Sequence, residues 1–475
     1  MKRGLRRPLI ALVVTVFVVG AWVGAPLMAA PADPLGPEGS PGIAVAGVGP
    51  SPVPSASGPS GSAGVQAPSA VPPRSSPSPS SAATRPPAHS PGAAASPAVS
   101  SSPAASSLHR PASATPLLLA ALDARLERLR AKYGIPGISA SILFADGSAW
   151  HGTAGFADVV AKRKVTDQTA FPVASVSKTF TSALILRLAE DRLLDLDASV
   201  RSYLPTLGIS RAITVRELLD HTSGLRDFFF HPRIDHDLLT KPTLVWDAAR
   251  SLKYLGKPYG KPGTSWHYSN TNYLVLGLVA EAVGGGTVAE QLRARFFTPL
   301  GLDRTFYQSV EKPRGPLARS YRFLGTDPTL PAIDLSDGTQ VVPFTSVVTA
   351  AGAAGSIAST SSDLVRWAQA LYGGSLLEPA TRAEMVGDVV RTAPYKPSVA
   401  YGLGVQSVLI AGHPTLGHSG RYLGARAAIR WVTDERIAIA VVTNQSRSDT
   451  NKVLADLLKI ALQPRSDCLT CPGIP

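Results

Sequence analysis

The spacing of hydrophobic and polar positions first predicts a helix and a hairpin. Apolar residues recur every three or four positions over residues 117–133, and Gly134 and Pro136 then end this amphipathic helix. Alternating patterns over 139–144 and 149–155 predict two strands, joined by an Asp-Gly pair that is typical of a tight turn. The folded part of the chain therefore starts with a helix followed by two paired strands.

Strand patterns disappear in the middle of the chain and return near its end. An apolar run with helical spacing starts at Ser175 and reaches about residue 194, and residues 195–400 are rich in helix and turn signals. A final helix is expected over residues 451–462. The late strands are expected at 401–409, 415–418, 425–432 and 437–443. Because strands lie at both ends, the sequence predicts one sheet built from both ends and a helical subdomain between them.

The first 30 residues have the pattern of an export signal. Lysine and arginine residues precede an apolar stretch over residues 9–30. This stretch is also long enough to remain as a membrane anchor, so cleavage and retention both stay open. No cysteine lies near it, which excludes a lipoprotein anchor. We predict an exported protein that is extracellular, associated with the cell envelope or anchored in the membrane.

Residues 31–115 predict a disordered linker. They contain 19 of the 42 prolines and no Phe, Trp or Tyr, so they cannot bury enough apolar surface to offset their conformational entropy. The segment is either a spacer that lets an enzyme reach away from a membrane or a low-complexity tail without a selected role. One domain is expected over residues 116–464, which hold nearly all the aromatic residues, with a short tail over 465–475.

Charge and cysteine content narrow the functional classes. The net charge of +13 is spread thinly, with no basic stripe that contains aromatic residues, so we expect no nucleic-acid partner. Cys468 and Cys471 lie in the tail, where a local disulfide is possible in an oxidising compartment. A metal would need two more ligands, and none lies nearby, so no metal or cofactor is expected. The oligomeric state is left open.

Ser175 and Lys178 are the strongest candidates for chemistry. A serine is a weak nucleophile at neutral pH unless a base takes its proton. Lys178 follows Ser175 by three positions, so both side chains lie on one face of the first helical turn, where backbone N–H groups favour developing negative charge. The Ser-x-x-Lys pattern is common by chance, and two later motifs raise its weight.

The second motif is Tyr268-Ser269-Asn270. An ammonium group near Tyr268 would favour its ionised form, so Tyr268 beside Lys178 is a candidate general base for Ser175. Asn270 is expected to orient Lys178 through a hydrogen bond. The alternative is an ordinary tyrosine in the turn that starts a helix, with Ser269 or Asn270 as its cap.

The third motif is His418-Ser419-Gly420, at the end of a late strand. Gly420 permits close approach of a substrate, and Ser419 is a candidate ligand for a substrate carboxylate. The N–H groups of Arg421 and Ser175 are expected to form an oxyanion hole. The alternative is a simple bend between strands.

Together the three motifs resemble those of the penicillin-recognising serine hydrolases, in particular class C β-lactamases, serine D-alanyl-D-alanine carboxypeptidases and related esterases. The resemblance extends over residues 117–463. It includes the further segments 215–225, 299–302, 354–356 and 401–404, and Tyr273-Leu274. It implies an α/β, β-lactamase-like fold with an antiparallel sheet flanked by helices and a helical subdomain. It also implies Ser175 as nucleophile, with Lys178 and Tyr268 as the proton-transfer pair.

Within this resemblance, one departure bears on the substrate. The β-lactamases of this group usually have lysine where this chain has His418, and neutral histidine holds a carboxylate less firmly. The His-Ser-Gly form is more similar to the carboxypeptidase branch. We therefore predict a hydrolase that forms an acyl-enzyme on an amide or ester, of D-alanyl-D-alanine carboxypeptidase type with a cell-wall peptide or other small substrate. An esterase, a β-lactamase and a non-catalytic envelope binding protein are the alternatives.

Two other arrangements are weaker. Asp220-His221 suggests a Ser-His-Asp triad, but the chain has no Gly-x-Ser-x-Gly elbow. His221, His231 and His236 do not have the spacing of metal ligands on a helix or hairpin.

Overall fold

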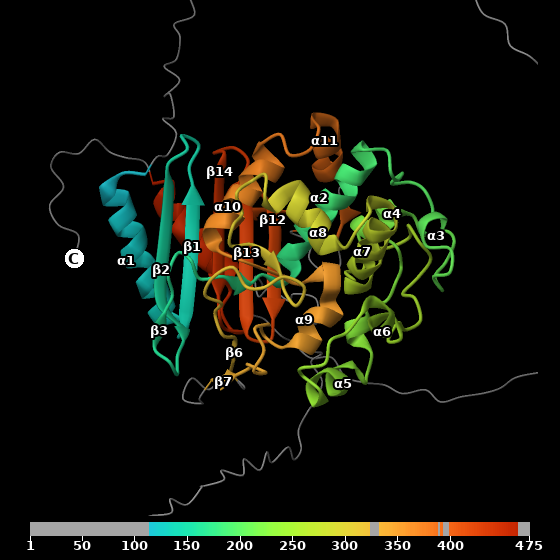
Figure 1. The fold of residues 1–475 in the computed structure, drawn as a ribbon. Coiled ribbons are helices and arrows are strands. Elements are labelled where there is room, and N and C mark those ends of the chain that lie inside the picture. Colours follow the sequence, from blue (N-terminus) through green and yellow to red (C-terminus); the bar gives the residue numbers. More distant parts are fainter. Residues whose placement is uncertain (1–113, 324–331, 388–389, 393–398, 464–475) are drawn as a thin grey trace, which may run out of the picture. The chain divides into compact units, whose positions relative to one another are not determined.

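The computed structural model describes residues 114–323, 332–387, 390–392 and 399–463. At their centre is an antiparallel sheet of nine strands in the order β3-β2-β1-β14-β13-β12-β11-β10-β9 (Figure 1). The strands are β1 (Gly137–Leu143), β2 (Ala149–Asp158), β3 (Arg163–Lys164), β9 (Val390–Arg391), β10 (Ala400–Tyr401), β11 (Gln406–Ile410), β12 (His413–Tyr422), β13 (Ala425–Val432) and β14 (Ile437–Thr443). β1 pairs with β14, so the sheet joins both ends of the folded part, as predicted.

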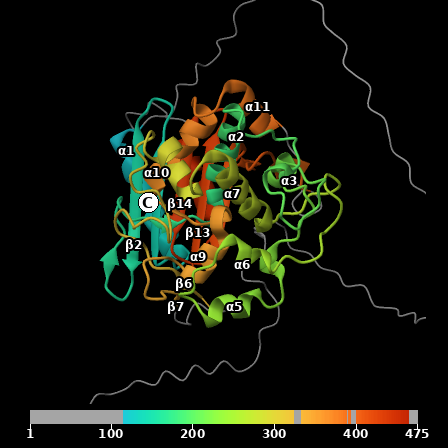
Figure 2. The same ribbon diagram turned by 45° about the vertical axis from the view of Figure 1, so that its right-hand side comes forward.

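Helices pack on both faces of this sheet (Figures 1 and 2). On one face, α1 (Pro116–Lys132) and α12 (Thr450–Ala461) bury leucines against Ile138 and Ile142 of β1. On the other face, α2 (Ser177–Glu190) and α10 (Ser361–Ala368) share a core with Ala427 and Ile429 of β13. Because side chains alternate between the two faces of a strand, a single strand such as β13 contributes residues to the hydrophobic core on each face of the sheet. This is the β-lactamase-like α/β arrangement expected from the sequence.

The helical subdomain comes from the middle of the chain, as expected. Its helices and turns, with those that connect it to the sheet, are η1 (Ala174–Val176), α3 (Val200–Tyr203), α4 (Val215–Leu219), η2 (Phe228–Phe230), α5 (Ile234–Thr240), α6 (Ala248–Leu252), α7 (Asn270–Gly284), α8 (Val288–Leu292), η3 (Arg293–Phe297), α9 (Thr345–Ala351), η4 (Gly352–Ala354), η5 (Gln369–Gly373) and α11 (Pro379–Gly387). The small strands β4 (Phe171–Pro172), β8 (Ile357–Ser359) and β5 (Phe306–Tyr307) form one minor sheet, and β6 (Tyr321–Arg322) and β7 (Ile333–Asp334) form another.

Three expected elements have different bounds. The strand expected over 415–418 is β12, which continues to Tyr422, so the His418-Ser419-Gly420 motif lies within the strand and not at its end. The single strand expected over 401–409 is split into β10 and β11, because Gly404 between them has a φ of +81° and a Cβ there would lie 1.7 Å from Ser182 Oγ. The helix that follows Ser175 ends at Glu190 rather than at residue 194, just before Arg192, which has a φ of +60°. The first helix and the two early strands lie within a few residues of their predicted positions.

The predicted signal or anchor over residues 1–30, the linker up to residue 113 and the Cys468/Cys471 tail lie outside the described residues. Among the residues described, no single helix has the length and apolar character needed to cross a membrane. The segments Asn270–Gly284 and Val288–Phe297 meet those criteria only as a pair, with a bend of 76° between them.

Candidate active site

Ser175 lies in η1, in the short turn that leads from β4 into α2. The preceding residue, Ala174, has a φ of +48°, a left-handed conformation that is costly for a residue with a side chain. Strain of this kind persists where the surrounding structure holds the backbone in place, here through the bond from Val173 N to Ile357 O of β8 (3.0 Å). The turn thus fixes Ser175 at the N-terminal end of a buried helix.

Lys178 lies one helical turn after Ser175 and is fully buried, and its side chain points back toward the Ser175 hydroxyl. Its Nζ lies 3.1 Å from Ser175 Oγ, 2.7 Å from Asn270 Oδ1 and 2.9 Å from the carbonyl oxygen of Ala354. An ammonium group has three donors, and these three acceptors satisfy all of them. A neutral amine fits equally well, because its lone pair then accepts the Ser175 proton and its two N–H groups serve the other partners. The site is therefore suited to both protonation states of Lys178.

Asn270, the first residue of α7, connects Lys178 to a buried carboxylate, that of Asp227, which was not predicted from the sequence. Asn270 Nδ2 donates to Asp227 Oδ2 at 2.7 Å. The other carboxylate oxygen, Oδ1, accepts the N–H of Phe229 at the start of η2 (3.0 Å). Asp227 is 1% exposed, so its charge is not screened by solvent.

Burial favours the uncharged forms of both Lys178 and Asp227 and shifts their pKa values accordingly. It lowers the pKa of Lys178 to about 7, while the negative charge of Asp227 acts in the opposite direction. Burial also raises the pKa of Asp227 to about 6, against the hydrogen bonds from Asn270 and Phe229 and the charge of Lys178. A lysine with a pKa near 7 exists partly as the free amine at neutral pH, so it can take a proton.

Tyr268 is the third member of the group, and its ring lies 5.0 Å from Lys178 Nζ. Burial raises the pKa of Tyr268 well above its usual value, although the nearby Ser175 hydroxyl lowers it in part. Among the described residues, the Tyr268 hydroxyl has no hydrogen bond of regular geometry. The structure thus brings the three predicted side chains together, but it keeps Tyr268 protonated and leaves its hydroxyl available for another partner.

Gly420 allows strand β12 to lie directly against the backbone of Ser175, the predicted nucleophile. A Cβ at this position would lie 2.0 Å from the carbonyl oxygen of Val173 and 3.2 Å from Ser175 N, so no side chain fits. The described pairing of β11 with β12 ends at Gly417, and from there to Tyr422 β12 pairs with β13 only. Beyond Gly417 this edge of β12 therefore has no described strand partner, although Ser419 N donates to Gln406 Oε1 at 3.2 Å, and Arg421 N follows directly after the point of contact with Ser175.

The side chains of His418 and Ser419 are engaged by internal partners. His418 Nδ1 lies 2.7 Å from the carbonyl oxygen of Ser419, so Nδ1 carries a proton, and Nε2 lies 3.0 Å from the hydroxyl of Tyr401. Ser419 Oγ lies on the other face of the strand. There it donates to Gln406 Oε1 at 3.1 Å and accepts from Arg430 Nη2 at 3.2 Å. A role of Ser419 in binding substrate, suggested by the sequence, would require this buried network to open.

The site and the fold together agree with comparisons to known proteins. The model of the β-lactamase family matches residues 122–463, which is most of the chain. The chain belongs to the β-lactamase family. It is a serine hydrolase of the penicillin-recognising group, as its motifs predicted.

Relatives within the β-lactamase family carry several names. The chain is 29% identical to penicillin-binding protein 4 of Amycolatopsis lactamdurans over 337 residues, which cover 67% of this chain and 84% of that protein. It is 26% identical to a D-aminopeptidase of Cereibacter sphaeroides over 348 residues, covering 72% of this chain and 62% of that protein. The crystal structure of a D-stereospecific amidohydrolase from Streptomyces sp. superposes with a TM-score of 0.62 at 29% identity, covering 74% of this chain and 99% of that one.

His221 has a structural place in this β-lactamase-family fold. It is fully buried, with a φ of +69°, and its Nδ1 accepts the N–H of Ser269 at 3.2 Å. Its ring lies 4.4 Å from the ring of Tyr268, and burial lowers its pKa well below the usual value. His221 therefore supports the Tyr268 segment as a neutral ring.

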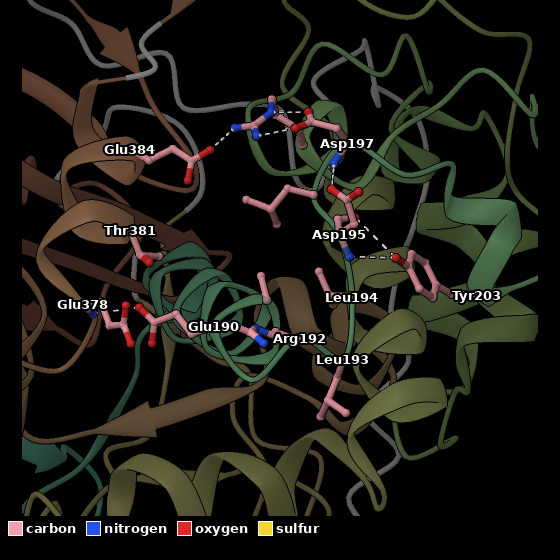
Figure 3. Close-up of a pocket in the computed structure, with 13 residues that line it drawn as sticks. Glu190, Arg192, Leu193, Leu194, Asp195, Asp197, Tyr203, Glu378, Thr381 and Glu384 are labelled. Carbon is pink, nitrogen blue, oxygen red and sulfur yellow. Dashed lines mark hydrogen bonds and ion pairs between the residues drawn. The ribbon is translucent and has the colours of Figure 1, made fainter. Parts of the chain in front are cut away.

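A separate pocket of about 650 Å³ lies at the other end of α2 (Figure 3). Glu190, the last residue of α2, lines it together with Glu378 and Glu384. Arg216 bridges two of its acidic side chains, at 2.6 Å from Asp197 and 2.7 Å from Glu384. Its lining includes none of the three predicted catalytic residues, so it is distinct from the candidate active site.

One group of possible metal ligands occurs in the part of the chain that the structure describes. His413, Asp434 and Glu435 have ligand atoms within 4.8 Å of one another. His413 Nδ1 already lies 2.9 Å from Asp434 Oδ2; His413 is the first residue of β12, and Asp434 and Glu435 lie in the turn between β13 and β14. A hydrogen bond between the side chains of His413 and Asp434 accounts for this geometry.

Proposed function

We propose that this serine hydrolase cleaves amide bonds through an acyl-enzyme on Ser175. The observation that carries the proposal is the 3.1 Å contact between Ser175 Oγ and a fully buried lysine whose other two donors are already bound. A non-catalytic binding protein has no need of a nucleophile that is bonded to its own base. Such a protein is the alternative, and absence of any covalent adduct would favour it.

The proposed reaction assigns the proton transfers by pKa. The free amine of Lys178 takes the Ser175 proton as Oγ bonds to the substrate carbonyl carbon, and the N–H groups of Ser175 and Arg421 receive the oxyanion. Tyr268, which keeps its proton, donates it to the leaving nitrogen as the C–N bond breaks, and Lys178 returns a proton to Tyr268. Water then attacks the ester carbonyl carbon while the free amine of Lys178 takes its proton. The bond to Ser175 Oγ breaks, Oγ receives that proton from Lys178, and the carboxylic acid product leaves. The sequence indicated Tyr268 as the base, but burial raises the pKa of Tyr268 and lowers that of Lys178, which supports Lys178 in that role.

The direct test is the location of a covalent adduct. After reaction with a fluorophosphonate or a penicillin, intact-mass spectrometry is expected to show one added group per chain. Peptide mapping should place this group on Ser175. An adduct on another residue, or none with either reagent, would contradict the proposal.

Substitution of Tyr268 by phenylalanine is expected to affect amides more than activated esters. An amide leaving group must be protonated, whereas p-nitrophenolate leaves without a proton, so we expect kcat to fall about 10²-fold on an amide and much less on a p-nitrophenyl ester. Steady-state kinetics on both substrates measures the difference. Equal losses on the two substrates would remove Tyr268 from the role of proton donor.

We propose further that the preferred amides carry no carboxylate on the leaving group. His418 and Ser419, the side chains expected to hold such a carboxylate, are both engaged by internal partners. The named D-aminopeptidase and D-stereospecific amidohydrolase support amides of D-amino acids as the substrate class. The D-alanyl-D-alanine carboxypeptidase predicted from the sequence is the second candidate, supported by the penicillin-binding relative.

A matched pair of peptides separates these two substrates. An acyl-D-Ala-D-Ala peptide is compared with the same peptide bearing a C-terminal amide, and nitrocefin and a p-nitrophenyl ester are measured beside them. We expect the amidated peptide to be cleaved at least as well as the free acid. A preference of tenfold or more for the free carboxylate would establish the carboxypeptidase instead.

We also propose that the enzyme is exported, on the basis of the basic and apolar residues 1–30. Activity or antibody signal in the medium, envelope or membrane fraction of the producing cell would support export. Signal confined to the cytoplasm would contradict it.

A further inference from the structure

Asp227 is a buried carboxylate directly behind the proposed catalytic group. It reaches Lys178 through a single side-chain amide: Asp227 Oδ2 accepts from Asn270 Nδ2 at 2.7 Å, and Asn270 Oδ1 accepts from Lys178 Nζ at 2.7 Å. Asp227, Asn270 and Lys178 are all at least 95% buried, so solvent does not weaken this chain of bonds. Asp227 therefore touches no reacting atom, but it contacts the group that holds the base.

The carboxylate of Asp227 fixes which end of the Asn270 amide faces Lys178. An ionised carboxylate only accepts hydrogen bonds, and both oxygens of Asp227 already do so, from Asn270 and from Phe229. Asn270 must therefore direct its NH₂ group toward Asp227, which leaves its oxygen for the donor Lys178. Without the charge on Asp227 the amide could rotate, and its NH₂ group would then oppose the N–H groups of Lys178.

Other groups around Lys178 bring no second negative charge to it in the described structure. The rings of Tyr268 and Tyr273 lie 5.0 and 5.3 Å from Nζ, and burial raises the pKa of both phenols, which keeps them protonated. His221, from the segment after α4, is neutral because burial and the charge of Lys178 both lower its pKa. On β12, the ring of His418 lies 6.3 Å from that of Tyr268 and carries no negative charge. Asp227 is therefore the negative charge that favours the ammonium form of Lys178.

We propose that Asp227 is a positioning residue of the reaction, which orients the Asn270 amide toward Lys178 and stabilises the ammonium that forms when Lys178 takes the proton of Ser175. This proposal rests on the proposed function only in giving Lys178 the role of base. The link between Asp227 and the proton affinity of Lys178 can be measured without any substrate.

The test is a titration of Lys178 in the full chain and in Asp227→Asn. Protein labelled with [13Cε]lysine is titrated by two-dimensional NMR, with the Lys178 signal assigned from its loss in Lys178→Met. A negative charge raises the pKa of a nearby amine, so its removal must lower that pKa, and we expect the midpoint to fall by about one pH unit. In fluorophosphonate labelling, the acid limb of the rate should move to lower pH, with a plateau about tenfold lower because the amide is no longer oriented.

A charge exchange gives the opposite expectation. In the double variant Asp227→Asn/Asn270→Asp, the amide introduced at position 227 can still accept from Phe229 N and donate to the carboxylate introduced at position 270, so the hydrogen bonds are kept. The negative charge, however, now contacts Lys178 directly. We expect the Lys178 midpoint to rise above that of the wild type. A purely structural role for Asp227 predicts no fall of the Lys178 midpoint in Asp227→Asn, and the rise in the double variant verifies that the Lys178 signal responds to a charge beside it.

Asp363→Asn is the matched control. Asp363 is also buried and accepts hydrogen bonds from Arg304 N and Thr305 Oγ1, but it has no link to Lys178. The Asp363→Asn substitution is expected to lower the Tm of the protein without moving the titration midpoint of Lys178. An unchanged Lys178 midpoint in folded Asp227→Asn would overturn the proposal for Asp227. Failure of the wild-type protein to react with the fluorophosphonate would instead overturn the proposed function, and the NMR titration would still decide the role of Asp227.

Discussion

Substitution of Ser175 by alanine is expected to abolish covalent labelling by a fluorescent penicillin or a fluorophosphonate. The Ser175 hydroxyl is the one nucleophilic oxygen among the three described partners of Lys178 Nζ, and the variant lacks it. Removing a small hydroxyl from a half-buried turn leaves the backbone of η1 and the acceptors Asn270 and Ala354 of Lys178 in place. The variant should therefore remain folded while hydrolysis falls to background, which gel fluorescence and initial rates measure together.

Ser182→Ala is the control for this experiment. Ser182 lies on α2, and its hydroxyl is 3.1 Å from Tyr273 Oη, so its loss tests the effect of removing a buried serine near the site. Tyr273 keeps its bond to the carbonyl oxygen of Leu219 at 2.9 Å. We expect Ser182→Ala to be labelled at close to the wild-type rate. Labelling of Ser175→Ala at that same rate would show that another residue is the nucleophile.

The sequence was sufficient to predict the parts of the site that depend on local spacing. Ser175 and Lys178 are one helical turn apart, so their contact follows from helix geometry once α2 is recognised. The meeting of that pair with Tyr268 and Asn270, in a later motif far along the chain, was predicted only through the resemblance of the motifs to a known family. The sheet built from both chain ends followed from strand patterns on either side of a helical middle.

Other features depend on tertiary packing and left no signal in the sequence. Asp227 has the ordinary appearance of a helix cap, and indeed its Oδ1 caps η2; its second contact, to Asn270, exists only because η2 packs beside α7. The orientation of Ser419 depends on which face of β12 it occupies and on Arg430 from the neighbouring strand. The sequence around Ser419, with Gly417 and Gly420 on either side, shows neither the face of the strand that Ser419 occupies nor its contact with Arg430.

Substitution of Lys178 by methionine is expected to lower the rate of Ser175 acylation by about 10³-fold or more. Methionine has a similar length and fills the same buried space, but it has no lone pair on nitrogen to take the proton of Ser175. It also leaves Asn270 Oδ1 and the carbonyl oxygen of Ala354 without a donor, at about 1–3 kcal/mol each. The carboxylate of Asp227 also stays buried without its positive partner, so Tm should fall as well. Stopped-flow labelling and thermal unfolding measure the two effects separately.

Lys178→Arg distinguishes proton transfer from charge alone. Arginine keeps a positive charge and several donors for Asn270 and Ala354, but its guanidinium does not lose a proton in the accessible pH range. If Lys178 is the base, the arginine variant must be nearly as slow as the methionine variant, and raising the pH to about 9 must not restore it. A rate within tenfold of wild type would mean that the positive charge alone activates Ser175. In that case the base would have to be sought elsewhere in the site, with the phenol of Tyr268 as the first candidate despite its burial.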